Sequence, residues 1–450
     1  MKTMLTAFLL PTSTNTMKTT TRNVDDSRTL WTIFKHLIPV GILVLHLLPA
    51  HAQQNSPPAS SPPKASAWTP AASLSVKEVY DGNVFMQSVT PLANQSSFVT
   101  VLTPSVGTQW KPAPAFTLSA NYSPEIAFYH SESSEDYVAH RGALNLGGKF
   151  KDTSWELPNT FTWIDGSDQG LIFTGPGGAP ALGGVPMRDR RDAFVYRGGF
   201  KLQHSIGKWF IRPVASAYVH DFKTEQLATR GYQNYADRND VNGGLDLGYQ
   251  VMKETHVVLG YRHGSQDQEI VLAGPLQYDN SYDRVLLGVE GKPAAWLKLA
   301  VFLGPDFRSF GPDVPPGFDR HRTKVFLDAT ATITPGSADT ITLTAKRFEQ
   351  PGYGGNSVYE DVTYEIGWRH SFSDKLSAGV SVRALNWNFE APVIRNEWWY
   401  GVNVSVAYRF SKHVSAEASY AYDQVESRVP DTEGREASRH LASLGVKLTY

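Results

Sequence analysis

The sequence predicts an all-β fold, a closed transmembrane antiparallel β-barrel of about 18 strands with short periplasmic turns and long extracellular loops. Three observations predict it. Apolar and polar residues alternate with a period of two beyond residue 74, tight turns and long loops alternate between these segments, and the chain ends on Tyr450. A period of two is typical of a strand with two different faces, and no stretch after residue 60 sustains the 3.6-residue period of a helix.

Composition excludes several classes of protein. The chain of 450 residues carries 42 basic and 43 acidic side chains, so it lacks the basic surplus of a nucleic-acid-binding protein. It contains no cysteine, which excludes disulfides, thiolate nucleophiles and cysteine-based zinc sites. Its mean hydropathy is negative, which argues against a helical membrane protein.

The N-terminus carries the three parts of a secretory signal peptide. Arg22, Arg28 and Lys35 precede the apolar run 37–48, and an Ala-x-Ala site follows at Ala50 and Ala52. The run is shorter than the roughly 20 apolar residues that cross a bilayer as a helix. We therefore expect residues 1–52 to be a signal peptide cleaved after Ala52. A start of translation at Met17 would keep all three parts of this signal. An uncleaved membrane anchor is the competing interpretation.

The rest of the chain divides into a leader and a barrel. Residues 53–73 are rich in Pro, Ser and Ala and predict a flexible periplasmic leader. In the barrel, residues 74–450, Val402, Val404 and Val406 alternate with Asn403 and Ser405. The same pattern recurs in 116–122, 144–150, 194–203, 245–251, 257–261, 285–289, 297–303, 325–333, 341–345, 361–369, 378–382 and 414–422. The 450 − 52 = 398 remaining residues leave about 22 for each of 18 strands with its connection, enough for strands of about 9–11 residues.

The connections alternate in length. Tight turns are expected at 151–154, 206–208, 252–255, 292–295, 334–339, 373–375 and 411–413, and long loops at 166–191, 224–238, 268–280, 305–320, 351–356 and 426–437. This alternation indicates hairpin turns at one rim and extended loops at the other. A soluble β-sandwich or propeller is the competing all-β architecture, but it gives no reason for the asymmetry.

The C-terminal strand explains the terminal aromatic residue. In a barrel that faces lipid, aromatic rings belong at the boundary between hydrocarbon and water, so the last strand can end on Tyr450. Such a strand also resembles the signal that barrel-assembly machinery recognises in outer-membrane proteins, with Gly445, Leu448 and Tyr450 as its candidate residues. We expect this machinery, outer-membrane lipid and lipopolysaccharide to be partners.

Two segments resemble a family. They are residues 73–87 (SLSVKEVYDGNVFMQ) and 359–382 (YEDVTYEIGWRHSFSDKLSAGVSV), and they are similar to the β-barrel porin 2-like family of bacterial outer-membrane β-barrel proteins. The family has an Asp-Asn pair in the first segment, whereas here Gly82 separates Asp81 from Asn83. The resemblance implies an outer-membrane barrel over residues 74–450. Some relatives belong to exopolysaccharide secretion systems, which implies polysaccharide export components as further partners. No set of functional residues comes with it.

The sequence shows no catalytic or cofactor motif, so we expect neither an enzyme nor a cofactor. His130 and His140 could face each other across a hairpin, but interfacial or loop histidines are the simpler interpretation. The acidic residues Glu132, Glu135 and Asp136 would suit calcium or cations that bridge lipopolysaccharide, or simply a solvated loop. The run at 188–192 (RDRRD) would grip lipid phosphates or form a constriction.

The polar face of each strand is assigned to the lumen. Its candidate pore-lining residues are Arg141, Lys149, Arg197, Lys201, Arg262, Lys298, Arg369, Arg383, Arg409, Asp246, Glu290 and Glu365, together with Arg284, Lys346, Lys447, Asp328 and Glu417. Because an unpaired buried charge is costly, such an interior is expected to be wet. Basic groups outnumber acidic ones, which favours anions. The competing interpretation is that these charges pair across strands as structural ladders.

The aromatic residues suggest two roles. Most of Trp155, Trp163, Trp209, Trp296, Trp368, Trp387, Trp398, Trp399 and Tyr400 lie near expected strand ends, where a girdle is their usual role. Stacking on sugars along a translocation path is the alternative, and one ring of the pair Trp398 and Trp399 should face inward.

These observations predict a porin-like outer-membrane channel with a water-filled, mildly basic lumen for passive passage of solutes. The alternative is the barrel component of an exopolysaccharide export system. A receptor with a globular plug is disfavoured because only about 20 residues precede the first strand, and an outer-membrane hydrolase lacks a nucleophile and base at the rim.

Overall fold

The computed structural model describes residues 68–86, 88, 93–166, 192–223, 226–227, 234–270, 272, 276–352, 357–390, 394–429 and 436–450. The signal peptide, its cleavage residues Ala50 and Ala52, the leader up to residue 67 and the run 188–191 lie outside these residues.

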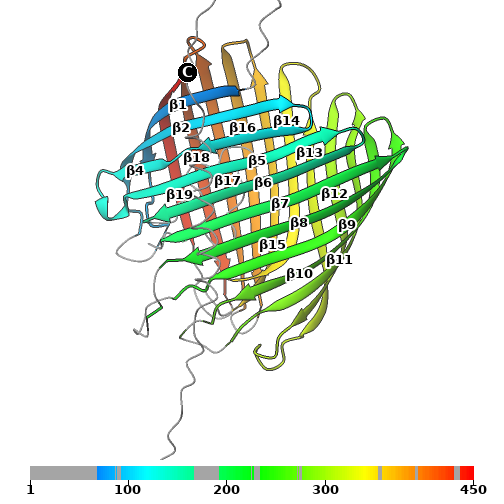
Figure 1. Cartoon of the computed structure of the whole chain (residues 1–450). Helices are drawn as coiled ribbons and strands as arrows, with labels where there is room; N and C mark the ends of the chain where they lie inside the picture. The colour runs from blue at the N-terminus through cyan, green and yellow to red at the C-terminus, as the bar shows by residue number, and fades with distance from the viewer. Residues whose placement is uncertain are drawn as a thin grey trace, which may run out of the picture. The chain divides into compact units, whose positions relative to one another are not determined.

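The described chain is almost entirely β-strand (Figure 1). Its only helical element is a short 3-10 turn, η1 (Ser133–Glu135), among the described residues. None of the described helical structure is long and apolar enough to cross a bilayer. The strands are β1 (Trp68–Asp81), β2 (Ser97–Ala113), β3 (Phe116–Tyr122), β4 (Glu125–Tyr129), β5 (Tyr137–Phe150), β6 (Thr153–Asp165), β7 (Ala193–Ile206), β8 (Trp209–Phe222), β9 (Arg238–Met252), β10 (Thr255–Gln268), β11 (Asn280–Ala294), β12 (Leu297–Phe310), β13 (His321–Ile333), β14 (Asp339–Pro351), β15 (Val358–Ser371), β16 (Leu376–Phe389), β17 (Arg395–Arg409), β18 (Val414–Arg428) and β19 (Ala437–Thr449).

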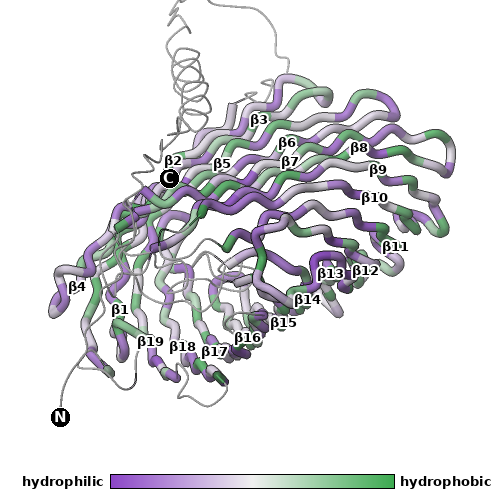
Figure 2. Tube along the Cα trace, turned by 90° about the horizontal axis from the view of Figure 1, so that it is seen from below, coloured by the Kyte–Doolittle hydropathy of each residue, from purple (hydrophilic) through white to green (hydrophobic). Residues whose placement is uncertain are grey.

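The 19 segments form 18 strands of a closed barrel. β3 and β4 pair with the same neighbours, β2 and β5, and are halves of one strand, so 19 − 1 = 18. The interruption falls at Ser123 and Pro124, and proline cannot donate to the ladder. Each strand pairs antiparallel with the next, and β1 pairs with both β2 and β19, which closes the ring (Figure 2). The predicted fold is confirmed.

The two rims differ as predicted. Connections of two to five residues lie at the turn rim: 114–115, 151–152, 207–208, 253–254, 295–296, 334–338, 372–375 and 410–413. Connections of five to 27 residues lie at the loop rim: 82–96, 130–136, 166–192, 223–237, 269–279, 311–320, 352–357, 390–394 and 429–436. One expected loop, 305–320, was placed too early, because Pro305–Phe310 continue β12, and Pro305–Ser309 pair with β13. The proline is tolerated in β12 because alternate residues in a strand point their N–H groups to different sides.

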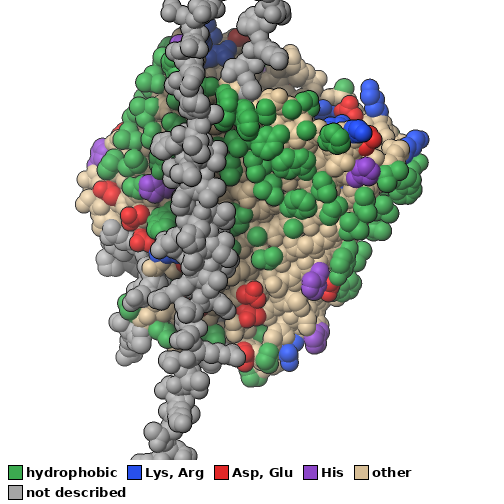
Figure 3. Space-filling model, viewed as in Figure 1, with side chains coloured by type: hydrophobic (Ala, Val, Ile, Leu, Met, Phe, Trp, Pro, Cys, Tyr) green, Lys and Arg blue, Asp and Glu red, His purple; other side chains and the backbone are tan. Residues whose placement is uncertain are grey.

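The outer face of the wall is apolar. Val402, Val404 and Val406 are 42%, 42% and 45% exposed. Figure 3 shows hydrophobic side chains gathered over the outer face, with charged ones mainly toward the rims. Such an exterior is stable in contact with lipid or detergent chains rather than water, and a closed barrel leaves no unpaired strand edge in the hydrocarbon.

Near the loop rim the inner face forms a packed core. One cluster joins Val79, Val99, Tyr129, Tyr137 and Leu441 to Val84 of the loop 82–96, and a second is built around Trp387 and Trp399. Residues 82–84, at the start of this loop, turn into the barrel immediately after β1. The Gly82 amide donates to the His440 carbonyl (2.8 Å), the Asn83 amide to Asp81 Oδ1 (3.1 Å), and the Asn83 side chain to the Ser438 carbonyl (2.9 Å).

The wall changes character between β13 and β14. Their register covers only Leu327–Ile333 against Ile341–Arg347, whereas β16 and β17 pair from Leu376 to Phe389. Beyond this stretch, β13 pairs only with β12, and β14 pairs only with β15.

The free end of β14 lies on the inner face of β9 and β10. Arg238 donates to the Pro351 carbonyl (2.7 Å), Gln266 donates to the Glu349 carbonyl (3.3 Å), and Gln268 donates to the Gly352 carbonyl. On the loop side of the β13–β14 seam, the end of β14 therefore overlaps the strands on the other side of the seam. Side chains there bind the backbone carbonyls of β14 that a β13–β14 ladder would otherwise have paired.

Candidate functional site: the barrel lumen

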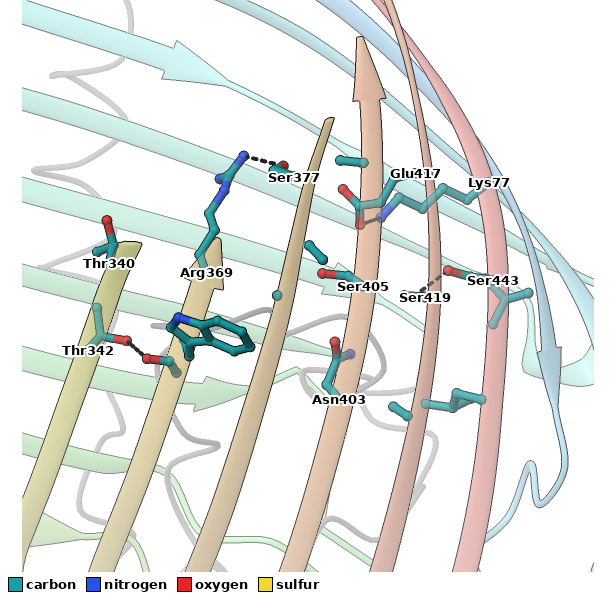
Figure 4. A pocket seen from close by; sticks show the side chains of 18 residues that line it. Lys77, Thr340, Thr342, Arg369, Ser377, Asn403, Ser405, Glu417, Ser419 and Ser443 are labelled. Carbon is teal, nitrogen blue, oxygen red and sulfur yellow. Dashed lines mark hydrogen bonds and ion pairs between the residues drawn. The ribbon is translucent and has the colours of Figure 1, made fainter. Parts of the chain in front are cut away.

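The turn-rim half of the lumen holds a cavity of about 380 Å³ that we call the hydroxyl cavity. It is lined by small or hydroxyl-bearing side chains from β14 to β19 and β1, including Thr342, Ser405, Ser419 and Ser443 (Figure 4). These residues share the inner face because Ser405 stands opposite Ser419, and Ser419 opposite Ser443, in successive registers. The hydroxyls of Ser419 and Ser443 lie 2.7 Å apart. The surface offers hydrogen bonds but little charge.

Three charged side chains reach this cavity. Lys77 Nζ lies 3.6 Å from Glu417 Oε1, and Arg369 donates to the Ser377 hydroxyl at 3.1 Å. Gly445 stands between Lys77 and Glu417 in the registers of β1, β19 and β18. A Cβ at residue 445 would approach Lys77 Cγ to 2.5 Å. The ion pair therefore passes over a glycine, at a position where a side chain would collide with Lys77.

A second cavity of about 400 Å³ lies against β7 to β13 and is charged. Its wall contains an ion-pair network centred on Arg212, which is 3% exposed on β8. Arg212 Nε contacts Asp246 Oδ2 (2.8 Å), and its terminal nitrogens reach both oxygens of Glu290 (2.6 and 3.1 Å). Arg262 contacts the other oxygen of Asp246 at 2.6 Å. Gly260 makes room for this network, because a Cβ there would lie 2.6 Å from Asp246 Oδ1.

A belt of buried charges crosses the strands on the loop side. Arg439 contacts Asp81 (3.0 Å), and it lies opposite Asp423 in the β18–β19 register. Trp399 donates its ring N–H to Asp423 at 3.1 Å, and Arg383 lies 3.6 Å from Glu365. Alternating signs let each charge face an opposite one, which offsets the loss of hydration.

The overlap at the β13–β14 seam contains five more charges, which we call the seam cluster: Arg308, Arg322, Lys324, Glu349 and Glu390. Arg322 contacts Glu349 at 3.1 Å and also binds Glu390. Lys324 contacts Glu390 at 2.8 Å, and Arg308 lies 3.8 Å from Glu349. The side chains of Arg308 and Glu349 are 0% and 1% exposed. This cluster binds the end of β14 to β12 and β13.

The pore-lining residues expected from the alternation fall into three groups. Asp246, Glu290, Glu365, Arg262 and Arg383 enter the buried ion pairs. Lys201 and Arg369 line the charged and the hydroxyl cavity, respectively. The remainder lie elsewhere: Arg141 pairs with Glu125 (3.1 Å), Arg197 is partly buried on β7, and Lys149, Lys298 and Arg409 are exposed near the turn rim, where Arg409 binds the Asp374 carbonyl.

Other expected features have local roles. Tyr450 is 94% exposed, its amide donates to the Ala72 carbonyl (2.9 Å), and Leu448 is 49% exposed. Asp136 accepts the Tyr129 amide (2.7 Å), and no group of three metal-ligating side chains occurs among the described residues. His140 binds the Tyr122 hydroxyl at 2.6 Å.

The aromatic residues divide between the two faces. Trp163, Trp209, Trp296 and Trp368 are exposed, as a girdle requires. Trp387 and Trp399 are buried in the lumen core, at 0% and 2% exposure, so the girdle interpretation was wrong for these two. Within the adjacent pair, Trp399 faces inward and Trp398 stacks on Tyr400.

Sequence reasoning missed the most buried charges. Asp306 and Arg308 fell in the expected loop 305–320, and Arg212 precedes Pro213 where the alternation is weak. Glu349 was missed because it lies on the same side of β14 as Ile341 and Leu343, the side that alternation assigns to lipid. At the overlap this side of β14 faces β12 and β13 instead.

The comparisons with known proteins concern the fold. No family model matches the chain, and no curated protein matches it. The outer membrane protein OpdK of Pseudomonas aeruginosa is 11% identical over 85% of this chain and 99% of OpdK, with a TM-score of 0.40. OccAB3 of Acinetobacter baumannii is 9% identical over 85% and 99% of the two chains (TM-score 0.41), and the siderophore receptor PirA of P. aeruginosa is 10% identical over 87% and 81% (TM-score 0.41).

The location follows from the wall itself. An even number of antiparallel strands, closure without an edge, an apolar exterior and a polar interior are the features of single-chain bacterial outer-membrane barrels. The protein is a porin-like β-barrel of the bacterial outer membrane.

Proposed function

We propose that the protein is a passive channel, rather than an enzyme, for small hydrophilic solutes across the outer membrane. The observation that carries this proposal is the pair of cavities on the inner wall, of about 380 and 400 Å³, lined by hydroxyl and charged groups. Barrels of 16–18 strands leave an aqueous channel. Polar walls of this kind replace part of the hydration of a passing solute without binding it tightly.

The channel is proposed to prefer anions weakly. The charged cavity is lined by four basic residues (Lys201, Arg212, Arg262, Arg284) and three acidic ones (Asp246, Glu290, Asp328), a surplus of 4 − 3 = 1. The hydroxyl cavity is lined by Lys77 and Arg369 against Glu417, again a surplus of 2 − 1 = 1. Most of these charges are paired, so the residual field is small, and focusing by the wall gives a modest preference.

Reversal potentials in planar bilayers under a salt gradient test both statements. We expect single-channel conductance with a reversal potential on the anion side. Arg369→Gln, which removes one lumen charge outside the buried networks, should lower the anion preference slightly. Absence of conductance would overturn the channel, and cation selectivity would overturn the preference.

The export of a polysaccharide is the second candidate function, and the hydroxyl cavity favours it. A wall of Ser, Thr, Gly and Ala across β14 to β19 offers shallow, exchangeable hydrogen bonds along which a hydrated neutral polymer would slide. With this candidate function we propose membership of the β-barrel porin 2-like family and polysaccharide export components as partners. Block of the conductance by neutral oligosaccharides, stronger for longer chains, would support it, and rapid swelling of liposomes by small sugars would favour the general channel.

Assembly and processing complete the proposal. Secretion is proposed to remove residues 1–52 by cleavage after Ala52. The assembly machinery is proposed to recognise Gly445, Leu448 and Tyr450 on the last strand, with lipid and lipopolysaccharide around the finished barrel. The mass of the mature chain from outer-membrane fractions tests the cleavage, because an uncleaved chain retains the mass of the first 52 residues.

A further inference from the structure

We propose that Arg197 and His220, on neighbouring strands near the loop rim, form a binding site in the lumen for one small anionic group, a chloride ion or the carboxylate of a passing solute. The inference deepens the proposed anion preference and rests on that function only for its role in transport.

Arg197 differs from five buried arginines of the lumen. Arg212, Arg284, Arg308, Arg383 and Arg439 each have a carboxylate oxygen within 4.0 Å. Arg197 has no such ion pair among the described residues, and its guanidinium lies over the Tyr218 ring, 5.4 Å from the centroid. Its Nε–H is buried and has no hydrogen-bond acceptor in the described part of the chain.

His220 presents a second donor. It is 5% exposed, its Nδ1 lies 3.0 Å from the Tyr218 hydroxyl, and its Nε2 has no hydrogen-bond partner among the described residues. Arg238 Nη2 donates to the same hydroxyl at 3.3 Å. The simplest arrangement is therefore a chain in which Arg238 donates to Tyr218, Tyr218 donates to His220 Nδ1, and the imidazole proton sits on Nε2. A buried N–H is then left to donate.

The two donors lie close together. Arg197 stands opposite Tyr218, and Val195 stands opposite His220, in the β7–β8 register. Arg197 and His220 are therefore diagonal neighbours on the inner face, within reach of one group placed between long side chains. The neighbouring carboxylates are occupied: Asp240 accepts from Gln266 and the Tyr282 hydroxyl, and Asp361 accepts from Gln350.

An anion fits this arrangement better than water alone. Buried donors in native proteins are almost always satisfied, so each orphan N–H calls for an acceptor. Here both orphan donors belong to a site with the positive charges of Arg197 and Arg238. A bound anion would supply an acceptor for both N–H groups and also offset the charge, whereas water supplies only the acceptor.

The site is tested first by binding, without transport. The full mature barrel in detergent is unfolded thermally at constant ionic strength in sodium chloride, sodium formate or sodium gluconate, whose anion is too bulky for a buried site. We expect the unfolding temperature to rise with chloride and formate for the native chain and for Arg369→Gln, and to be independent of the anion for Arg197→Gln and His220→Gln. Equal unfolding temperatures of the native chain in all three salts would mean that water alone occupies the site and would overturn the proposal.

Planar bilayers then test its role in transport. Arg197→Gln should reduce the permeability ratio of chloride to sodium on the order of fivefold, the effect of one charge acting at about 4 Å through water. Arg197→Lys, which keeps the charge, should retain most of it. A response to chloride larger than that to formate identifies the halide as the preferred ligand, and the reverse identifies the carboxylate.

The two proposals fail in different ways. If the native chain does not conduct, but chloride or formate raises its unfolding temperature, the proposed channel is wrong and the proposed binding site stands. If the native chain conducts, and Arg197→Gln leaves both its selectivity and its salt response unchanged, the site is wrong and the channel stands.

Discussion

Two seams of the barrel wall are closed in different ways. At the β1–β19 seam, which joins the ends of the chain, backbone pairing runs from Ser73 to Asp81, and two ion pairs, Lys77–Glu417 and Asp81–Arg439, reinforce it on the inner face. At the β13–β14 seam the pairing stops at Leu327 and Arg347. Beyond that point the wall overlaps, and the seam cluster holds the two layers together.

The difference shows which interactions can close a sheet. A backbone ladder tolerates loss of single side chains, because the peptide groups still pair. A seam closed by side chains depends more on each charge, since removing one leaves its buried partners with fewer opposite charges. The β13–β14 seam is therefore expected to be the part of the wall that is most sensitive to single substitutions and to pH.

The largest effect should follow from loss of Glu349. Glu349→Ala leaves Arg308 and Arg322 buried beside an empty space with one carboxylate each, from Asp306 and Glu390. Breaking a buried pair costs up to about 3–5 kcal/mol. Urea unfolding of the folded barrel in detergent measures it. Glu349→Gln keeps the shape and removes only the charge, so its loss, set against that of Glu349→Ala, separates the charge from the packing. A loss below about 1 kcal/mol, the range of surface pairs, would mean that the seam cluster does not close the wall.

The second effect concerns the close packing at the β1–β19 seam. Gly445→Ala places a Cβ 2.5 Å from Lys77 Cγ and 3.2 Å from the Val76 carbonyl. Overpacking of this kind costs about 1–3 kcal/mol. Gly336→Ala, in a turn where an added Cβ meets no atom within 4 Å, is the matched control. Lys77→Ser in the Gly445→Ala background should recover part of the loss, and a failure to recover would place the strain in the backbone instead.

The sequence predicted the ladder well and the overlap not at all. The period of two at 402–410 and the alternating connections are local properties, and they predicted the strands, both rims and the closed ring. Inward charges such as Asp246, Glu290 and Arg383 followed from the same parity.

The seam cluster could not be predicted from parity. It joins Glu390, after β16, to Arg322 and Lys324 on β13, across strands that are not neighbours. The alternation of residues predicts which side of a strand a side chain occupies. It does not predict how the wall bends, and the bend brings side chains of unpaired strands together. Asp306 and Arg308 were lost for a simpler reason, because Gly304 and Pro305 resemble the start of a loop.

The third effect is a pH dependence at the β13–β14 seam. Burial raises the pKa of Glu390, but its hydrogen bond from Lys324 and the charges of Arg322 and Lys324 outweigh burial, so the pKa of this carboxyl lies below its ordinary value. A carboxyl with a lowered pKa in the folded state stabilises the fold above its unfolded pKa of about 4.3, and this stability is lost as the pH falls further.

Thermal unfolding between pH 7 and pH 3 measures this effect. Glu390→Gln should be less stable than the native chain at pH 7, and the difference should shrink toward pH 3. A difference that stays constant over this range would show that Glu390 acts through packing rather than charge.

The smallest effect should come from Glu417→Gln at the β1–β19 seam. Lys77 and Glu417 are 30% and 47% exposed, so water screens their attraction and already solvates both groups. Pairs of this kind contribute about 0.2–1 kcal/mol, and salt reduces the contribution further. Glu417→Gln and Glu349→Gln remove the same charge with the same change of atoms, so their ratio in urea unfolding compares the two seams directly. Equal losses in the free energy of unfolding would contradict this comparison. They would mean that the exposed pair stabilises the β1–β19 seam as much as the buried seam cluster stabilises the β13–β14 seam.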